Sequence, residues 1–208
     1  MFEAAASDWE AFYGNATAAR RRADDALALS KGRDAAYAAA LALALSGESS
    51  RSRAVADDLN ARFPEDTCVQ FMYLPTLRAQ LSLNVHDPAA AIQSLQAASR
   101  FDFAQGGTGF NGFFGALYPI YVRGTAYLAA RRPAEAAVEF QKVLDHPGAV
   151  LVDPMGAVAR LQLARSLVLA GNAAKAKSVY QDLLALWATG DADASLIKRA
   201  RAEFARLQ

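Results

Sequence analysis

The chain has 208 residues, of which 53% are hydrophobic, and a formal net charge of +1. So small a charge gives no broad basic or acidic field, and we therefore expect neither nucleic acid nor an anionic membrane as a partner. Alanine, a strong helix former, supplies much of the hydrophobic share, which predicts an all-α fold. The longest uncharged stretch, residues 103–122, contains five glycines and Pro119, so no membrane span is expected.

The first half of the chain predicts three pairs of helices. Gly14 with Asn15 separates the helices of the first pair, Asp34 is expected to cap the next helix, and Pro64 ends that pair. Pro75 predicts either a kink or a helix that begins near it, and Asp87 before a proline predicts a capped helix start. The expected helical hairpins span about residues 1–30, 34–64 and 67–100.

Between the third and fourth pairs, residues 101–114 read FDFAQGGTGFNGFF, an insertion rich in glycine and phenylalanine. The glycines at 107, 109 and 112 match the spacing of a dinucleotide-binding fingerprint. That chemistry needs a strand before the glycines, whereas a helix is expected here, so we do not expect a nucleotide. Two interpretations stay open: a loop that packs its phenylalanines on the edge of the fold, and a loop that contacts a partner.

The second half predicts two clearer hairpins, at about residues 113–146 and 154–188. In the latter, Ala164 and Ala176 are small enough for two helices to approach closely, and Gly171 provides the left-handed turn between them. Gly124 occupies the equivalent small position in the preceding hairpin. A last helix, at about residues 193–207, follows Asp191 and Asp193 and has an apolar stripe that would cover the final hairpin.

A second small residue recurs in every hairpin, at intervals of about 40 residues, which is typical of helical repeats that stack side by side. These positions are Ala19, Ser52, Ala91, Ala136 and Ala176. Each hairpin would bury its apolar stripe on the next one, because neither helix of a pair can bury it alone. The sequence therefore predicts a single domain over residues 1–208.

The spacing of small and aromatic residues resembles the tetratricopeptide repeat (TPR), most closely in Gly124, Tyr127, Ala136 and Phe140. The resemblance implies an α-solenoid of about five TPR-like hairpins with a C-terminal capping helix. Residues 118–208 also look like the C-terminal repeat region of bacterial eukaryotic-like serine/threonine protein kinases. No kinase motif is present, so this likeness implies a sensing or docking module without its effector.

Groups for catalysis or metal binding are scarce in the sequence. His86 and His146 both fall at expected helix ends, where a local hydrogen bond is the simplest role. Cys68 lies among apolar residues and is expected to be a buried thiol rather than a nucleophile. We therefore predict that the chain is not an enzyme and holds no cofactor or metal.

Binding is the better-supported function, with a protein or peptide as the partner. In TPR-like hairpins the first helix of each unit lines the concave surface, and tyrosines and amides suit a peptide there. The alternative is that individual tyrosines only pack between helices. The candidate peptide-binding residues are Tyr37, Tyr73, Thr76, Gln80, Tyr118, Tyr121, Thr125, Gln162 and Arg165.

Two hypotheses of function follow. The first is a non-catalytic interaction scaffold that binds a protein segment in its concave face; the second is a small-ligand sensor with a pocket near residues 101–114. The start MFEAAASDWE is acidic where a signal peptide would be basic and apolar, which favours the cytoplasm. The likeness to membrane-bound kinases leaves an extracytoplasmic location as the alternative. The oligomeric state is not indicated.

Overall fold

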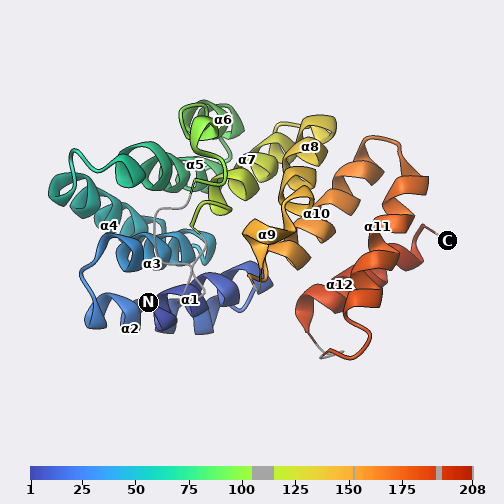
Figure 1. Cartoon of the computed structure of the whole chain (residues 1–208), viewed down its shortest axis with the longest axis horizontal. Helices are drawn as coiled ribbons and strands as arrows, with labels where there is room; N and C mark the ends of the chain where they lie inside the picture. Colours follow the sequence, from blue (N-terminus) through green and yellow to red (C-terminus); the bar gives the residue numbers. More distant parts are fainter. Residues whose placement is uncertain (105–114, 152, 191–193, 208) are drawn as a thin grey trace.

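The computed structural model describes residues 1–104, 115–151, 153–190 and 194–207, and every regular element in these ranges is helical (Figure 1). The prediction of an all-α fold is thereby confirmed. The α-helices are α1 (Phe2–Tyr13), α2 (Ala16–Leu29), α3 (Arg33–Leu45), α4 (Ser49–Arg62), α5 (Leu74–Asn84), α6 (Pro88–Leu95), α7 (Tyr118–Ala129), α8 (Pro133–Asp145), α9 (Pro147–Val150), α10 (Met155–Leu169), α11 (Ala173–Leu186) and α12 (Ser195–Ala205). A π-helical turn, η1 (Val69–Tyr73), precedes α5, and a 3-10 turn, η2 (Ala98–Phe101), follows α6.

Consecutive helices pack in pairs. The pairs are α1 with α2, α3 with α4, α5 with α6, α7 with α8, and α10 with α11. Neighbouring pairs also touch, through α2 and α3, α6 and α7, and α8 and α10. The short helix α9 was not expected. It lies in the connection between α8 and α10, where Pro147 occupies its first position.

Turn and capping residues account for several of the helix ends. Gly14 and Gly171 follow their helices with φ of 88° and 80°, a left-handed conformation that glycine adopts without strain. The Asp87 carboxylate accepts a hydrogen bond from the backbone N–H of Ala90 and so caps α6. The cap predicted at Asp34 is wrong, because α3 begins one residue earlier and Gly32 takes the cap position.

Some expected turns fall in or beside the undescribed ranges. The caps expected at Asp191 and Asp193 lie outside the described residues, and α12 begins at Ser195. Most of the insertion at 101–114 is likewise outside them. Pro75 stands in the first turn of α5, which confirms the prediction of a helix that begins near it.

Small residues let the helices of the first half approach closely. All ten residues from Ala35 to Ala44 in α3 are buried, and seven of them are alanine. Gly124 has the same role in the second half, since a Cβ atom built there would lie 2.7 Å from the ring of Phe140. Packing at such short range leaves no room for a larger side chain.

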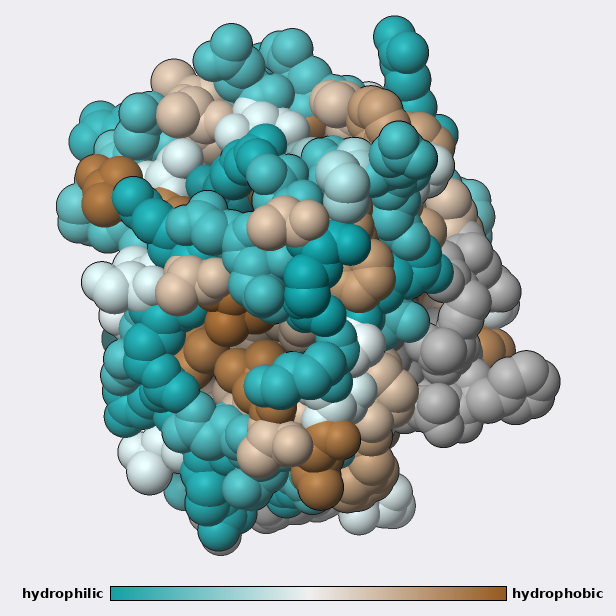
Figure 2. All heavy atoms as spheres, turned by 90° about the vertical axis from the view of Figure 1, so that its left-hand side faces the viewer, coloured by the Kyte–Doolittle hydropathy of each residue, from teal (hydrophilic) through white to brown (hydrophobic). Residues whose placement is uncertain are grey.

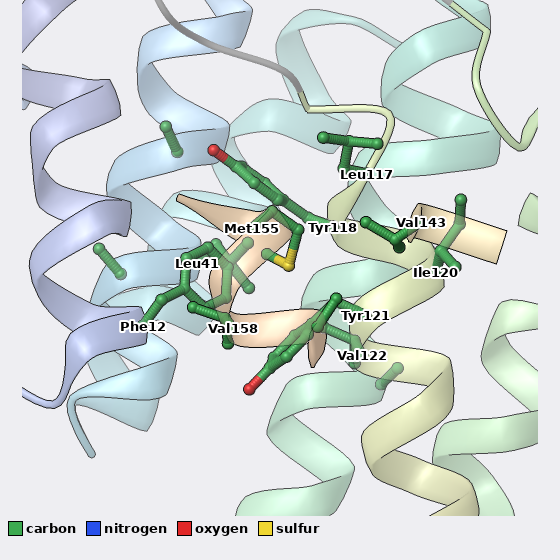
Figure 3. Packing of buried hydrophobic residues seen from close by; sticks show 14 of the residues in the cluster. Phe12, Leu41, Leu117, Tyr118, Ile120, Tyr121, Val122, Val143, Met155 and Val158 are labelled. Atoms are coloured by element: carbon green, nitrogen blue, oxygen red, sulfur yellow. The ribbon is translucent and has the colours of Figure 1, made fainter. Parts of the chain in front are cut away.

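The first helix also contacts the second half of the chain. Phe12 lies near the end of α1, and its ring centroid is 5.2 Å from those of both Tyr118 and Tyr121 in α7. Figure 3 shows Phe12 and Leu41 packed with these two tyrosines and with Met155 of α10. As a result, helices far apart in sequence share one hydrophobic core.

The helices can be compared with the length and polarity that a membrane-spanning helix needs. Within the described ranges, no helix combines the length and the apolar character that crossing a bilayer requires.

The surface that carries α2 to α4 is mostly hydrophilic, with hydrophobic side chains gathered in a hollow (Figure 2). A pocket of about 230 Å³ lies between these three helices, with Leu27, Ala36 and Val55 among its lining residues.

Candidate functional site

The nine candidate residues for peptide binding do not share an open surface. Six of them are buried, namely Tyr37, Tyr73, Thr76, Gln80, Tyr118 and Tyr121. Only Thr125, Gln162 and Arg165 are half-buried. The expectation that all nine project into an open concave face is therefore wrong for the first six, because α1 and the alanine-rich α3 pack tightly against the neighbouring inner helices.

The buried candidates on α3, η1 and α5 contact one another or form hydrogen bonds within the fold. The rings of Tyr37 and Tyr73 stack with centroids 3.9 Å apart, and the Tyr73 hydroxyl donates to Asp34 at 2.7 Å. Thr76 donates to the carbonyl of Met72 at 2.6 Å, a bond within its own helical segment. These side chains hold inner helices together, which agrees with the alternative that the tyrosines pack between helices.

Four of the candidates form a continuous chain of hydrogen bonds on α7 and α10. Thr125 donates to the carbonyl of Tyr121 at 3.0 Å, and the Gln162 amide donates to the Tyr121 hydroxyl at 3.2 Å. Arg165 then donates to the Gln162 side-chain oxygen at 3.4 Å. Sequence reasoning thus identified side chains that the structure brings together, although only three of the four are even partly exposed.

Arg165 is held by an acidic partner that the sequence analysis missed. Its guanidinium donates two hydrogen bonds to the Glu203 carboxylate of α12, at 2.9 and 2.6 Å, and the Tyr180 hydroxyl donates to the same carboxylate at 2.8 Å. Burial raises the pKa of Glu203, but the bonds from Arg165 and Tyr180 outweigh it and leave that pKa below its usual value. Glu203 is the one acidic residue in residues 194–208, a signal that could have revealed it.

An open groove lies beside this ion pair, and we call it the C-terminal groove. It has a volume of about 410 Å³ and is formed by α7, α10, α11 and the end of α12. Its lining residues are Leu128, Arg165, Val168, Leu169, Tyr180, Glu203, Arg206 and Leu207. Leu169 is 67% exposed and so keeps most of its apolar surface available at the edge of the groove.

The charge of the groove comes from two arginines in different situations. Arg165 is neutralised by Glu203 at 2.6 Å. Arg206 is exposed and forms no ion pair with any described residue. The groove therefore offers apolar walls and one available positive charge, a combination that suits an apolar group near a carboxylate.

A second ion cluster fixes the start of the 101–114 insertion. Arg123 of α7 is only 4% exposed and donates to Glu139 of α8 at 2.6 Å and to Asp102 at 2.7 Å. Lys142 completes the cluster with a 2.9 Å contact to Glu139. The fingerprint-like glycines at 107, 109 and 112 lie outside the described residues, as does most of the pocket expected near them.

The described histidine and cysteine side chains have local roles. His146 ends α8, where its Nδ1 lies 2.7 Å from the carbonyl oxygen of Lys142 and its ring stacks on Phe103. This confirms the predicted local hydrogen bond of His146. Cys68 is half-buried, and burial raises the pKa of its thiol, which makes it a poorer nucleophile.

The site best defined by the structure is the C-terminal groove, since its walls are open and its charged groups are positioned by α10 and α12. Among the described residues no group of three His, Cys, Asp or Glu side chains could hold a metal ion. The chain was compared with protein-family models, curated proteins and solved structures, and none of them matches it.

Proposed function

We propose that this chain is a non-catalytic interaction scaffold that binds a segment of another protein in the C-terminal groove. The observation that carries the proposal is the open apolar groove of about 410 Å³ with Arg206 at its edge. A groove of this size accommodates one or two apolar side chains of a peptide. The resemblance to repeat regions of signalling proteins adds that the module would dock or sense on behalf of a larger protein.

The proposal includes a TPR-like α-solenoid of five hairpins closed by α12. Its support is the succession of paired helices, each pair packed on the next. The small positions expected at close helix approaches are buried, including Ala136, Ala164 and Ala176. In such an array α12 takes the position of the first helix of a further hairpin and covers the last pair with Leu196 and Ile197.

The groove predicts the chemistry of its ligand. Val168 and Leu169 belong to the last turns of α10, and Leu128 of α7 and Leu207 after α12 complete an apolar lining. Burial of one leucine-sized side chain contributes about 1.5–3 kcal/mol. A carboxylate next to that side chain would pair with Arg206, so the expected ligand is a short acidic segment with at least one bulky aliphatic residue.

The test is selection of peptides on the purified chain from a random displayed library, followed by measurement of affinity by fluorescence anisotropy. Peptides bound in the groove should combine Leu, Ile or Val with Asp or Glu. The variant Leu169→Glu should weaken their binding by about tenfold or more, because it removes an apolar contact and adds a repulsive charge. Circular dichroism should be unchanged, since Leu169 is exposed.

A matched control is Val138→Glu, which alters an exposed aliphatic residue on α8, away from the groove. This variant should bind the selected peptides as the original chain does. Equal affinity of the Leu169→Glu variant and the original chain would contradict the proposal. So would a selection that yields only basic peptides, because Arg206 would repel them.

A further inference from the structure

The end of α1 closes the molecule by joining its two halves. Besides α2 and α3, α1 packs against α10. The Ser195 hydroxyl of α12 donates to the carbonyl of Tyr13, and the Tyr13 ring meets Trp187 with centroids 6.4 Å apart. The ring of Phe12 packs over the rings of Tyr118 and Tyr121 (Figure 3).

A buried carboxylate lies in this closing contact. Asp8 of α1 is fully buried, and within the described part of the chain neither of its carboxylate oxygens has a hydrogen-bond partner. Removal of a charged carboxylate from water without a partner is among the most unfavourable arrangements in a protein. The charged form of Asp8 therefore opposes the position that α1 occupies.

Around Asp8 the described residues place a second acid and no cation. Asp153, just before α10, is 4% exposed and raises the cost of charge on Asp8. The other titratable groups toward this contact are tyrosines, Tyr37 from α3, Tyr118 from α7 and Tyr13 on α1 itself. Tyr118 donates to Asp153 at 3.2 Å, and the backbone N–H of Met155 donates to it at 2.8 Å.

The basic residues that face α1 bind groups of this helix other than Asp8. Arg22 of α2 contacts Glu3 at 2.9 Å and Glu10 at 3.6 Å. Arg199 of α12 donates to the carbonyl of Tyr13 at 3.4 Å. Among the described residues neither Asp8 nor Asp153 forms an ion pair with a lysine or arginine, so protonation is the available way to neutralise the two acids.

We propose that α1 is a pH-responsive closing helix, docked while Asp8 and Asp153 are protonated and released from α7 and α10 when both are charged. Release would uncover the rings of Tyr118 and Tyr121, both candidates for contact with a peptide. The inference goes beyond the proposed use of the C-terminal groove, because it assigns a controlled opening to the opposite end of the chain.

The pKa directions agree with this geometry. Burial, followed by the charge of Asp153, raises the pKa of Asp8 well above its usual value, and burial raises the pKa of Asp153 to about 6. A group whose pKa is raised in the folded state stabilises that state fully below its unfolded pKa of about 4. The contribution is lost as the pH rises through the folded-state pKa, so docking of α1 weakens from about pH 4 upward.

The experiment is amide hydrogen exchange on the full chain between pH 5 and pH 8, with protection corrected for the intrinsic exchange rate at each pH. We expect protection of α1 relative to α8 to fall by about tenfold or more over this range. In the variant Asp8→Asn/Asp153→Asn the ratio should not change with pH. Asparagine keeps an oxygen that accepts from the N–H of Met155.

Asp25→Asn is the matched control, because Asp25 is an exposed acid on α2. In this variant the exchange protection of α1 should change with pH as it does in the original chain. A ratio in the original chain that does not change with pH would overturn the proposal. The same fall in the double variant as in the original chain would overturn it as well. Since the first outcome is read on the original chain, the test stands even if the double variant fails to fold.

Discussion

The centre of the molecule and its C-terminal groove both include α7 and α10 but are covered differently. At the centre, α1 packs against α3 and α10, and Tyr37 and Tyr118 are completely buried. At the other end the last turn of α10 borders the open groove, and Leu169 stays 67% exposed. A residue on α7 or α10 is therefore available to a ligand only where the neighbouring element leaves it uncovered.

The largest expected effect tests the closed centre. Phe12→Ala removes a buried ring that contacts Tyr118 and Tyr121, so it should lower the free energy of unfolding by about 3–5 kcal/mol. The measurement is urea denaturation followed by circular dichroism. A loss below about 1 kcal/mol would mean that α1 does not close the centre and would remove one side of the comparison.

A second substitution tests the hairpin that borders both regions. Gly124→Leu would place a side chain where even a Cβ atom meets the Phe140 ring at 2.7 Å, and should cost about 1–3 kcal/mol or more by overpacking. Urea denaturation again reports the change. Gly148→Leu is the control, since nothing lies within 4 Å of the added Cβ atom, and it should cost much less.

The stabilisation that the ion pair beside the groove provides should fall as the pH falls, whereas the docking of α1 at the centre should weaken as the pH rises. The pKa of Glu203 is lowered, so its contribution is present above its unfolded pKa of about 4.3 and is lost as the pH falls through the folded-state value. Glu203→Gln should cost about 1 kcal/mol at pH 7, a small value because both partners are about a quarter exposed.

The measurement for this pair is thermal unfolding at pH 7 and pH 3. The original chain should have a higher melting temperature than the Glu203→Gln variant at pH 7, and this difference should disappear at pH 3. An advantage that is equal at both pH values would show that the Arg165 and Glu203 contact is not a charged pair and would weaken the description of the groove.

The smallest expected effect is at the open side. Leu169→Ala removes an exposed side chain and should change the free energy of unfolding by less than about 0.5 kcal/mol. Thermal and urea unfolding would detect a larger loss. A loss comparable to that of Phe12→Ala would indicate that Leu169 is covered in solution and that the groove is not open.

The sequence predicted the helices well because their ends depend on local chemistry. Gly14 and Gly171 end helices through their left-handed backbone, and Asp87 caps α6 through its own side chain. Gly124 marked a close approach that Phe140 now explains. Each of these effects acts within a few residues or within one hairpin, so spacing alone was informative.

The coverage of the inner helices could not be predicted in the same way. Whether Tyr118 faces a ligand or the core depends on Phe12, more than one hundred residues away, as the 5.2 Å contact between their rings shows. Glu203 likewise meets Arg165 only through the orientation of α12. Repeat spacing predicts how the two helices of a hairpin pair but contains no information about which distant element packs over them.

The most direct test of this account is NMR chemical-shift mapping of the full chain with a peptide selected on it. The largest shifts should fall on backbone amides of Leu128, Val168, Leu169 and Leu207, which line the C-terminal groove. Shifts concentrated instead around Tyr37 and Tyr73, at the closed centre, would contradict it.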